Sequence, residues 1–185
     1  MSDLSVMVVG CGDVGGRLAL QMLDKGWQVS GLRRAVGQLP AGVQPVAADL
    51  AEPSIPQAWP QGPLDYLVYC VAASQHDEAG YQAAYVDGLR HVLAWLAQRG
   101  QRPRRLLFVS SSSVYAQKDG EWIEEGAATE PEGYSGRVML EAERLALASG
   151  IPASVVRLTG IYGPGREWLL SQVRQGYRVA EEPPL

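Results

Sequence analysis

The sequence has few of the features that mark membrane-spanning, secreted or nucleic-acid-binding proteins. Its longest apolar run, residues 64–73, is interrupted by Asp65 and is about half as long as a bilayer span requires. A net charge of −4 gives no reason to expect nucleic acid or an anionic membrane as a partner. The first residues include an acid and lead directly into a strand-like run, so we expect no secretory signal and a cytoplasmic protein.

Cysteine and histidine are also scarce. Cys11 and Cys70 each end an apolar run, and we expect two reduced, half-buried thiols there. Neither cysteine has metal-ligand spacing with His76 or His91, so the sequence predicts no metal site.

The remaining composition is that of one globular α/β domain. At 185 residues, with 46% apolar and 19% charged residues, the chain can bury one core and is not disordered. Apolar runs and helical periodicities alternate along it. The runs predict strands at residues 5–9, 27–32, 43–48, 64–73, 104–115 and 153–158, and the periodicities predict helices at 15–26, 81–99 and 135–149. Apolar strands separated by helices indicate a doubly wound, Rossmann-type parallel sheet covered on both faces, with ligands at the carboxyl ends of its strands.

A glycine pattern follows the first predicted strand. Gly10, Gly12 and Gly15 form G-x-G-x-x-G between this strand and its helix. The first glycine allows a tight turn, the second lets the backbone approach a pyrophosphate, and the third allows close helix–strand packing. Asp13 and Val14 then lie where free amides at a helix start meet phosphate charge. The pattern predicts a dinucleotide site, and the alternative is a turn that merely packs well.

Two arginines follow the second predicted strand. Arg33 and Arg34 stand where a site for NAD usually carries an acid that binds the ribose 2′-hydroxyl. Guanidinium groups there can bind a 2′-phosphate, which favours NADP over NAD, although both arginines could simply be solvated. Asp49, after the third strand, could accept from the adenine amino group or cap the following turn.

Six motifs in the chain resemble those of the extended short-chain dehydrogenases/reductases. The likeness is narrower to the NAD(P)-dependent epimerase/dehydratase family, which includes nucleoside-diphosphate-sugar epimerases, and it covers nearly the whole chain. The motifs are GCGDVG, AADL, CVAAS, FVSSSSVY, YSGRVMLEAE and VVRLTGIYGPG. The resemblance implies further cofactor contacts at Leu50, Ala72, Ala73 and Leu158. It also implies that residues 1–165 form the dinucleotide-binding domain, and that residues 166–185 begin a substrate-binding portion that is largely absent.

The same resemblance implies catalytic roles for Ser111 and Tyr134. Ser111 stands four residues before Tyr115, where the family has a hydroxyl that binds the substrate oxygen; the alternative is a polar strand end that caps the next segment. Tyr134 stands at the position of the family's acid/base. Val138 occupies the position of the lysine that lowers the pKa of that tyrosine. A free tyrosine has a pKa of about 10 and is a poor base at neutral pH.

No other residue clearly replaces that lysine. The only lysines are Lys25, at the end of the first helix, and Lys118, in the loop after the serine-rich strand. Arg137 lies close to Tyr134 on the predicted helix, but a guanidinium does not release a proton. Tyr85 also replaces an asparagine that is common in the family, so the sequence indicates an atypical branch.

Two functions remain open at this stage. The first is an NADP-dependent oxidoreductase or epimerase that acts weakly on a nucleotide sugar or a similar alcohol or carbonyl. The alternative is a catalytically silent NADP-binding regulatory or sensor protein. We expect a small-molecule substrate as the partner and neither nucleic acid nor membrane. The resemblance implies that a homodimer could form through the helices at 81–99 and 135–149.

Overall fold

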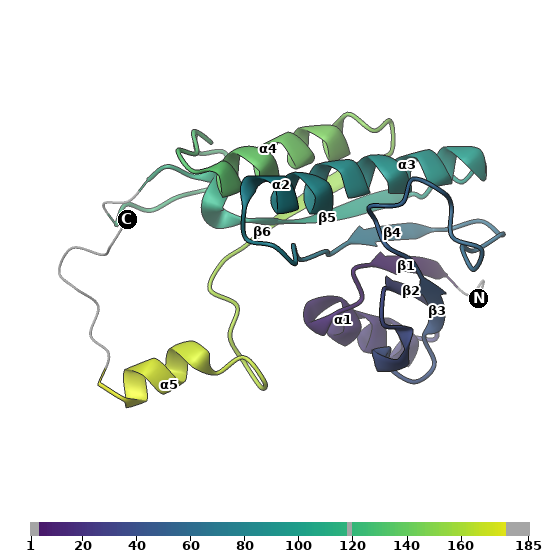
Figure 1. Ribbon diagram of the computed structural model, residues 1–185, viewed down its shortest axis with the longest axis horizontal. Coiled ribbons are helices and arrows are strands. Elements are labelled where there is room, and N and C mark those ends of the chain that lie inside the picture. The colour runs from purple at the N-terminus through teal and green to yellow at the C-terminus, as the bar shows by residue number, and fades with distance from the viewer. Residues whose placement is uncertain (1–3, 118–119, 177–185) are drawn as a thin grey trace.

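The computed structural model describes residues 4–117 and 120–176, and a six-stranded sheet organises them. The strands lie in the order β3-β2-β1-β4-β5-β6, and every neighbouring pair is parallel (Figure 1). The direction of winding changes between β1 and β4, which is where doubly wound sheets bind their ligands. The predicted Rossmann-type fold is therefore confirmed. The strands are β1 (Ser5–Val9), β2 (Gln28–Arg33), β3 (Gln44–Ala47), β4 (Tyr66–Tyr69), β5 (Arg105–Ser111) and β6 (Ala153–Leu158).

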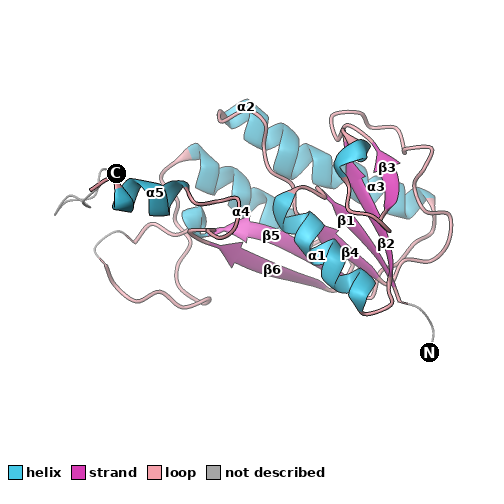
Figure 2. Ribbon diagram, turned by 90° about the horizontal axis from the view of Figure 1, so that it is seen from below, coloured by secondary structure: helices cyan, strands magenta, loops and turns pink. Residues whose placement is uncertain are grey.

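Helices cover both faces of this sheet, as the sequence predicted. α3 and α4 lie on one face and α1 on the other (Figures 1 and 2). The helices are α1 (Asp13–Asp24), α2 (Glu78–Tyr81), α3 (Gly88–Gln98), α4 (Tyr134–Leu147) and α5 (Trp168–Arg174). Shorter helical turns are η1 (Val36–Gln38), η2 (Gln82–Asp87) and η3 (Ser112–Val114).

Side chains alternate between the two faces of each strand, and this divides the hydrophobic core into two clusters. In β1, Met7 and Val9 pack in the cluster that also holds the buried residues of α3 and α4. Val6 and Val8, the residues between, pack instead against α1. Successive side chains of a strand point to opposite faces, so one apolar strand serves both clusters. This explains why the strands are continuously apolar in sequence.

Several elements differ from the prediction. The strand predicted at 104–115 ends at Ser111, where η3 begins, and two further differences form part of the cavity described below. β4 ends at Tyr69, and residues 70–77 leave the sheet, whereas the apolar run predicted a strand to residue 73. The helix predicted to begin at residue 81 begins at Glu78, because the Asp77 carboxylate accepts from the Gly80 amide and caps it. α5 was not predicted.

A π-helical turn, η2, joins α2 to α3 and is held by the sheet beneath it. The Tyr69 hydroxyl donates to the Ala84 carbonyl at 2.5 Å, and burial raises the pKa of Tyr69, which keeps this hydroxyl protonated. Turns of this kind are frequent at functional sites. Here the turn lies beside the carboxyl end of β4 and carries Tyr85.

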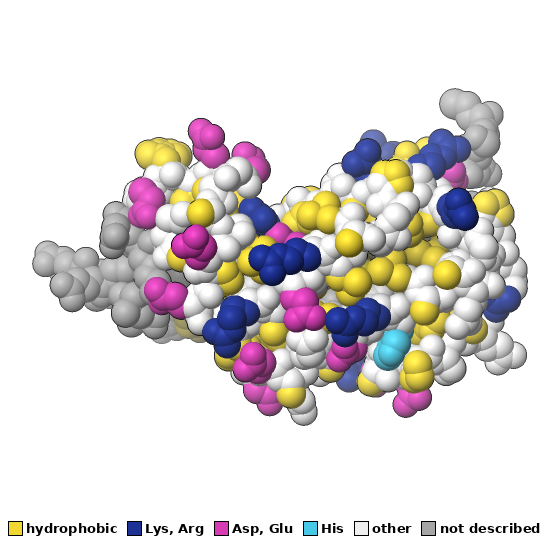
Figure 3. Space-filling view, turned by 90° about the horizontal axis from the view of Figure 1, so that it is seen from above, with side chains coloured by type: hydrophobic (Ala, Val, Ile, Leu, Met, Phe, Trp, Pro, Cys, Tyr) yellow, Lys and Arg dark blue, Asp and Glu magenta, His cyan; other side chains and the backbone are white. Residues whose placement is uncertain are grey.

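Exposed ion pairs join α2, α3 and α4 on their outer face. Acidic and basic side chains are interspersed there (Figure 3), with Arg90 paired to Asp87 and Glu141, and Arg137 to Glu78. Each such pair contributes only about 0–1 kcal/mol to stability. No helix within the described residues is both long and apolar enough to cross a membrane.

Candidate functional site

A cavity of about 1060 Å³ opens at the carboxyl ends of the central strands. Pockets for small ligands are typically about 300–1,000 Å³, so this space can accept a large one. Most of the residues predicted to bind cofactor or substrate line it, although they come from separate parts of the chain. They are Gly10, Gly12, Asp13, Val14, Arg33, Arg34, Asp49, Leu50, Ala72, Ser111 and Leu158. The predicted residues Gly15, Ala73 and Tyr134 are not among those that line it.

The glycine turn has the geometry that a diphosphate requires. Gly10 has φ +85, and a Cβ atom there would overlap the carbonyl of Cys70. A Cβ at Gly15 would overlap the Gly10 carbonyl, so both glycines are required by packing. A Cβ at Gly12 would have no heavy atom within 4 Å, so the protein leaves this position open. α1 begins at Asp13, and its first amides have no partner within the helix. These residues therefore fit the diphosphate of a dinucleotide.

The two arginines after β2 differ in their freedom. The Arg33 guanidinium donates to the carbonyls of Cys11 and Gln38, at 3.4 and 3.2 Å, and to the Gln38 side chain, which holds it against η1. Arg34 is exposed and makes no side-chain hydrogen bond or ion pair with the described residues. Asp49 accepts from the Ala51 amide at 3.0 Å, so it caps the turn, one of its two predicted roles, while it also lines the cavity.

Two free thiols lie beneath the glycine turn. Cys11 is buried and Cys70 half-buried. Burial raises the pKa of both thiols; the Arg33 charge opposes the rise for Cys11, and the Gly15 amide opposes it for Cys70. Raised pKa values keep both side chains neutral and poorly reactive at neutral pH. They act as packing residues, and no cluster of metal-ligating side chains occurs among residues 4–117 and 120–176.

The structure separates the two residues predicted to be catalytic. Ser111 lines the cavity, and its Oγ accepts from the Ser113 amide at 3.2 Å, which leaves its own hydrogen free to donate. The Tyr134 hydroxyl donates to the His76 carbonyl at 2.6 Å, and its ring packs edge-on against Tyr81. Tyr134 is therefore held by His76 and Tyr81 and is not among the residues that line the cavity.

Among the described residues, neither Arg137 nor Lys25 lines the cavity as a replacement for the missing lysine. Val138 is only 4% exposed and packs in the core beneath α4, so a lysine at this position would be desolvated. Arg137 points outward, donating to the Glu132 carbonyl and pairing with Glu78. Lys25 caps the far end of α1, and Lys118 lies outside the described residues.

Two tyrosines, Tyr85 and Tyr81, line the cavity. The contacts of Tyr85 show the state of its phenol. Its hydroxyl accepts from the Ala73 amide at 3.3 Å, so this amide is already engaged. Burial raises the pKa of Tyr85, while the Ala73 amide opposes the rise. The phenol is therefore a proton donor at neutral pH. The sequence marked Tyr85 as unusual but gave no reason to place it in the site.

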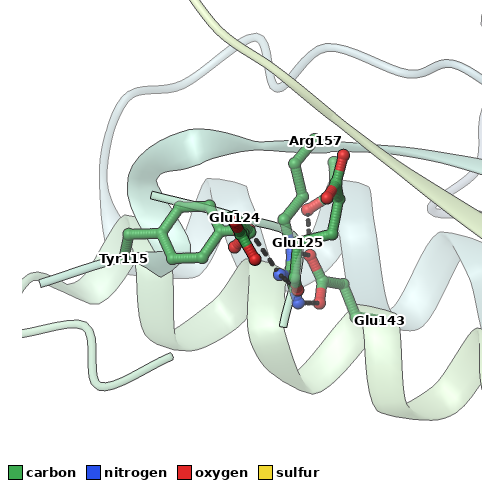
Figure 4. Close-up of polar contacts among 6 residues, drawn as sticks. Tyr115, Glu124, Glu125, Glu143 and Arg157 are labelled. Atoms are coloured by element: carbon green, nitrogen blue, oxygen red, sulfur yellow. Dashed lines mark hydrogen bonds and ion pairs between the residues drawn. The ribbon is translucent and has the colours of Figure 1, made fainter. Parts of the chain in front are cut away.

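A buried ionic network supports the serine strand from behind, and the sequence did not predict it. Glu143, 2% exposed, accepts from Ser110 Oγ at 2.6 Å and from Arg157 at 2.9 and 2.7 Å. Arg157 also donates to the Tyr115 hydroxyl at 2.8 Å and to the Glu125 carbonyl (Figure 4). The hydrogen bonds to the Glu143 carboxylate raise the pKa of Arg157, so this guanidinium stays charged. In the sequence, the only sign of this network was an acidic residue, Glu143, among the apolar positions of the predicted helix.

Known proteins with similar sequences and structures share this architecture. The sequence profile of the NAD dependent epimerase/dehydratase family matches residues 6–178. Protein YeeZ of Escherichia coli K12 is 27% identical over 167 residues, which are 87% of this chain and 60% of YeeZ. The chain thus spans less than two thirds of this curated relative.

Solved structures agree with the family match. An NAD-dependent epimerase/dehydratase from Methylobacillus flagellatus is 36% identical with a TM-score of 0.76, covering 96% of this chain and 63% of its own. The Bordetella bronchiseptica enzyme WbmG, solved with NAD and UDP, is 19% identical with a TM-score of 0.69 over 88% of this chain and 55% of its own, which shows a shared fold alone. Since the family profile spans most of the sequence, the chain belongs to the NAD dependent epimerase/dehydratase family.

Proposed function

We propose that this chain is an NAD(P)-dependent oxidoreductase or epimerase that acts on a nucleotide sugar. One observation carries the proposal: the glycine turn, open at Gly12 and followed by the free amides of α1, faces a cavity that also contains Ser111. The family match and the NAD and UDP bound to WbmG support the ligand classes.

The residues of the chain divide the work between two ends of the cavity. The amides of the glycine turn and α1 hold the diphosphate, and Arg34 faces the adenosine ribose. When bound, the cofactor supplies hydride exchange at its nicotinamide. Ser111 donates its free hydrogen to the substrate oxygen and orients it. Tyr85 stays protonated beside Ala73, so it can donate a proton but not accept one.

Weak turnover follows from the same geometry. Tyr134 must leave the His76 carbonyl before its hydroxyl can reach a substrate, and buried Val138 supplies no charge to ionise it. General acid–base assistance is worth about 10²–10⁴-fold in rate, so a misplaced base slows the reaction without abolishing it. The same two observations favour the second candidate function, a silent dinucleotide-binding sensor.

The choice between NAD and NADP depends on the residues that follow β2. The similar structures with a named cofactor contain NAD, and the family is described as NAD dependent. Only the arginines after β2 favour NADP, and Arg33 is already engaged by Gln38. The preference therefore depends mainly on Arg34.

The test is hydride transfer to bound cofactor. The chain is mixed with NAD⁺ or NADP⁺ and either UDP-glucose or UDP-galactose, and the absorbance of reduced nicotinamide is followed in a single turnover. We expect slow reduction, and we expect Ser111→Ala to slow it further, by about 10-fold or more, because the substrate oxygen loses its donor. Ser149→Ala, at the far end of α4, is the matched control and should react like the unsubstituted chain. If calorimetry shows that dinucleotide binds but no cofactor is reduced, the chain is the silent sensor and not the enzyme. If no dinucleotide binds, both candidate functions are refuted.

A further inference from the structure

The segment after β6 returns to the start of α1, far away in the sequence. Residues Gly163–Arg166 form a tight turn in which the Arg166 amide donates to the Gly163 carbonyl at 2.8 Å. Gly163 and Gly165 have backbone φ angles of +151° and +81°, which residues other than glycine rarely adopt. Arg17 Nη2 of α1 donates to the Pro164 carbonyl at 2.6 Å, and Arg166 Nε donates to Asp13 Oδ2 at 2.5 Å. These two contacts fix the turn beside the glycine loop.

Asp13 is the centre of this contact. Its carboxylate accepts a hydrogen bond from Arg17 through one oxygen and from Arg166 through the other. The hydrogen bond with Arg17, and to a smaller extent that with Arg166, holds the pKa of Asp13 below its usual range. Asp13 is the first residue of α1 and lines the cavity, so by itself it would repel a diphosphate at the helix start. Two guanidinium groups against one carboxylate leave the cluster with a net charge of +1. The cluster therefore attracts an anion.

Arg166 has the donors that such an anion requires. Its side chain is 44% exposed and lines the same cavity as Gly12 and Asp13. Only its Nε is bonded to Asp13, and within the described residues its two terminal nitrogens make no hydrogen bond. Its charge also lowers the pKa of the Cys70 thiol at the end of β4, against the larger effect of burial. The guanidinium therefore lies at the cavity beside the start of α1, with two nitrogens available to a ligand.

We propose that Arg166 is a ligand of the dinucleotide diphosphate, brought to the glycine turn by Asp13. The assignment rests on the proposed function, since it concerns the same dinucleotide. The backbone amides at the start of α1 donate to the diphosphate, and the two free nitrogens of Arg166 donate to it as well. Hydrogen bonds from a charged donor are stronger than those between neutral groups. The segment after β6 thus completes a cofactor site that begins at the first strand.

Calorimetric titration of the full chain with NADH and with ADP-ribose tests this assignment. ADP-ribose retains the diphosphate and lacks the nicotinamide. We expect Arg166→Gln to weaken the binding of both ligands by about 10- to 100-fold, because a charged hydrogen bond is lost at a group that both contain. Arg166→Lys, which keeps the charge, should recover part of the loss. The matched control is Arg105→Ala, which removes an exposed arginine at the amino end of β5 and should change neither affinity.

Three results would overturn the assignment, and they can be told apart. Unchanged affinities in Arg166→Gln would refute the Arg166 contact and leave the dinucleotide site standing. A loss for NADH but not for ADP-ribose would move Arg166 to the nicotinamide end. Failure of the unsubstituted chain to bind either ligand would refute the proposed function, and the role of Arg166 with it.

Discussion

The two ends of the cavity are built in different ways. The glycine-turn end consists mainly of backbone from β1 and the first turn of α1, residues that are adjacent in sequence. The serine end consists of side chains from β5, η2, α4 and the loop after β4, which only the fold brings together. The first end fits its expected ligand as it stands. At the second end, Ser111 faces the cavity while Tyr134 is bonded to His76.

This difference shows where the family pattern is most easily altered. A backbone site depends on a few glycines and tolerates changes elsewhere in the sequence. A side-chain site depends on several distant positions at once, and the resemblance to the family implies that two of them differ here, at Tyr85 and Val138. Ser110 and Ser111 show the same sensitivity on a smaller scale. Both serines line the cavity, but Ser110 Oγ donates to buried Glu143, whereas Ser111 Oγ accepts from the Ser113 amide.

The largest effect is expected from removing the ionic support of the serine end. Glu143→Ala should lower the free energy of unfolding by about 3–5 kcal/mol, because Arg157 and Ser110 lose their common partner in the interior. Urea denaturation measures it. Glu141→Ala is the control on the same helix: its exposed pair with Arg90 should be worth about 0–1 kcal/mol. Equal losses in the two variants would show that the buried network does not support this end.

A smaller effect, on binding alone, is expected at the glycine-turn end. Gly12→Ala should weaken dinucleotide binding by about 10-fold or more, because the methyl group enters the space where the backbone meets the diphosphate. The free energy of unfolding of this variant should change by less than about 1 kcal/mol, since no heavy atom beyond the adjacent residues lies within 4 Å of the added carbon. Gly62→Ala, also open but remote from the cavity, is the control for binding. An unchanged affinity in Gly12→Ala would mean that the diphosphate does not approach this turn.

The smallest effect is expected at the ribose. The unsubstituted chain should bind NADPH more tightly than NADH. Arg34→Ala should reduce the ratio of the two affinities by about 5- to 10-fold, because roughly one solvent-exposed charged contact is lost. Fluorescence titration with the two reduced cofactors measures it. Arg102→Ala, in the loop before β5, serves as the control. If the unsubstituted chain binds both cofactors equally, the arginines do not select NADP.

Local sequence was sufficient for most elements of the fold and for the position of the glycine turn. β1 and β6 have the predicted bounds, and Gly10, Gly12 and Asp13 lie where the pattern placed them, since a turn between a strand and a helix is a local structure. The length of β4 could not be predicted, because the apolar residues 70–72 line a cavity instead of continuing the strand. The Glu143–Arg157 pair and the Asp13–Arg166 contact join residues that no sequence period relates.

The sequence by itself determined that this protein is a parallel α/β domain with a glycine turn able to hold a diphosphate. Hydrophobic periodicity and the φ values open to glycine are properties of short segments, and they act wherever the segment lies. Only the tertiary structure decided which hydroxyls face the ligand, that Val138 is buried, and that Arg166 returns to α1. Those outcomes depend on packing and charge pairing between distant segments, and these interactions exist only after the chain has folded.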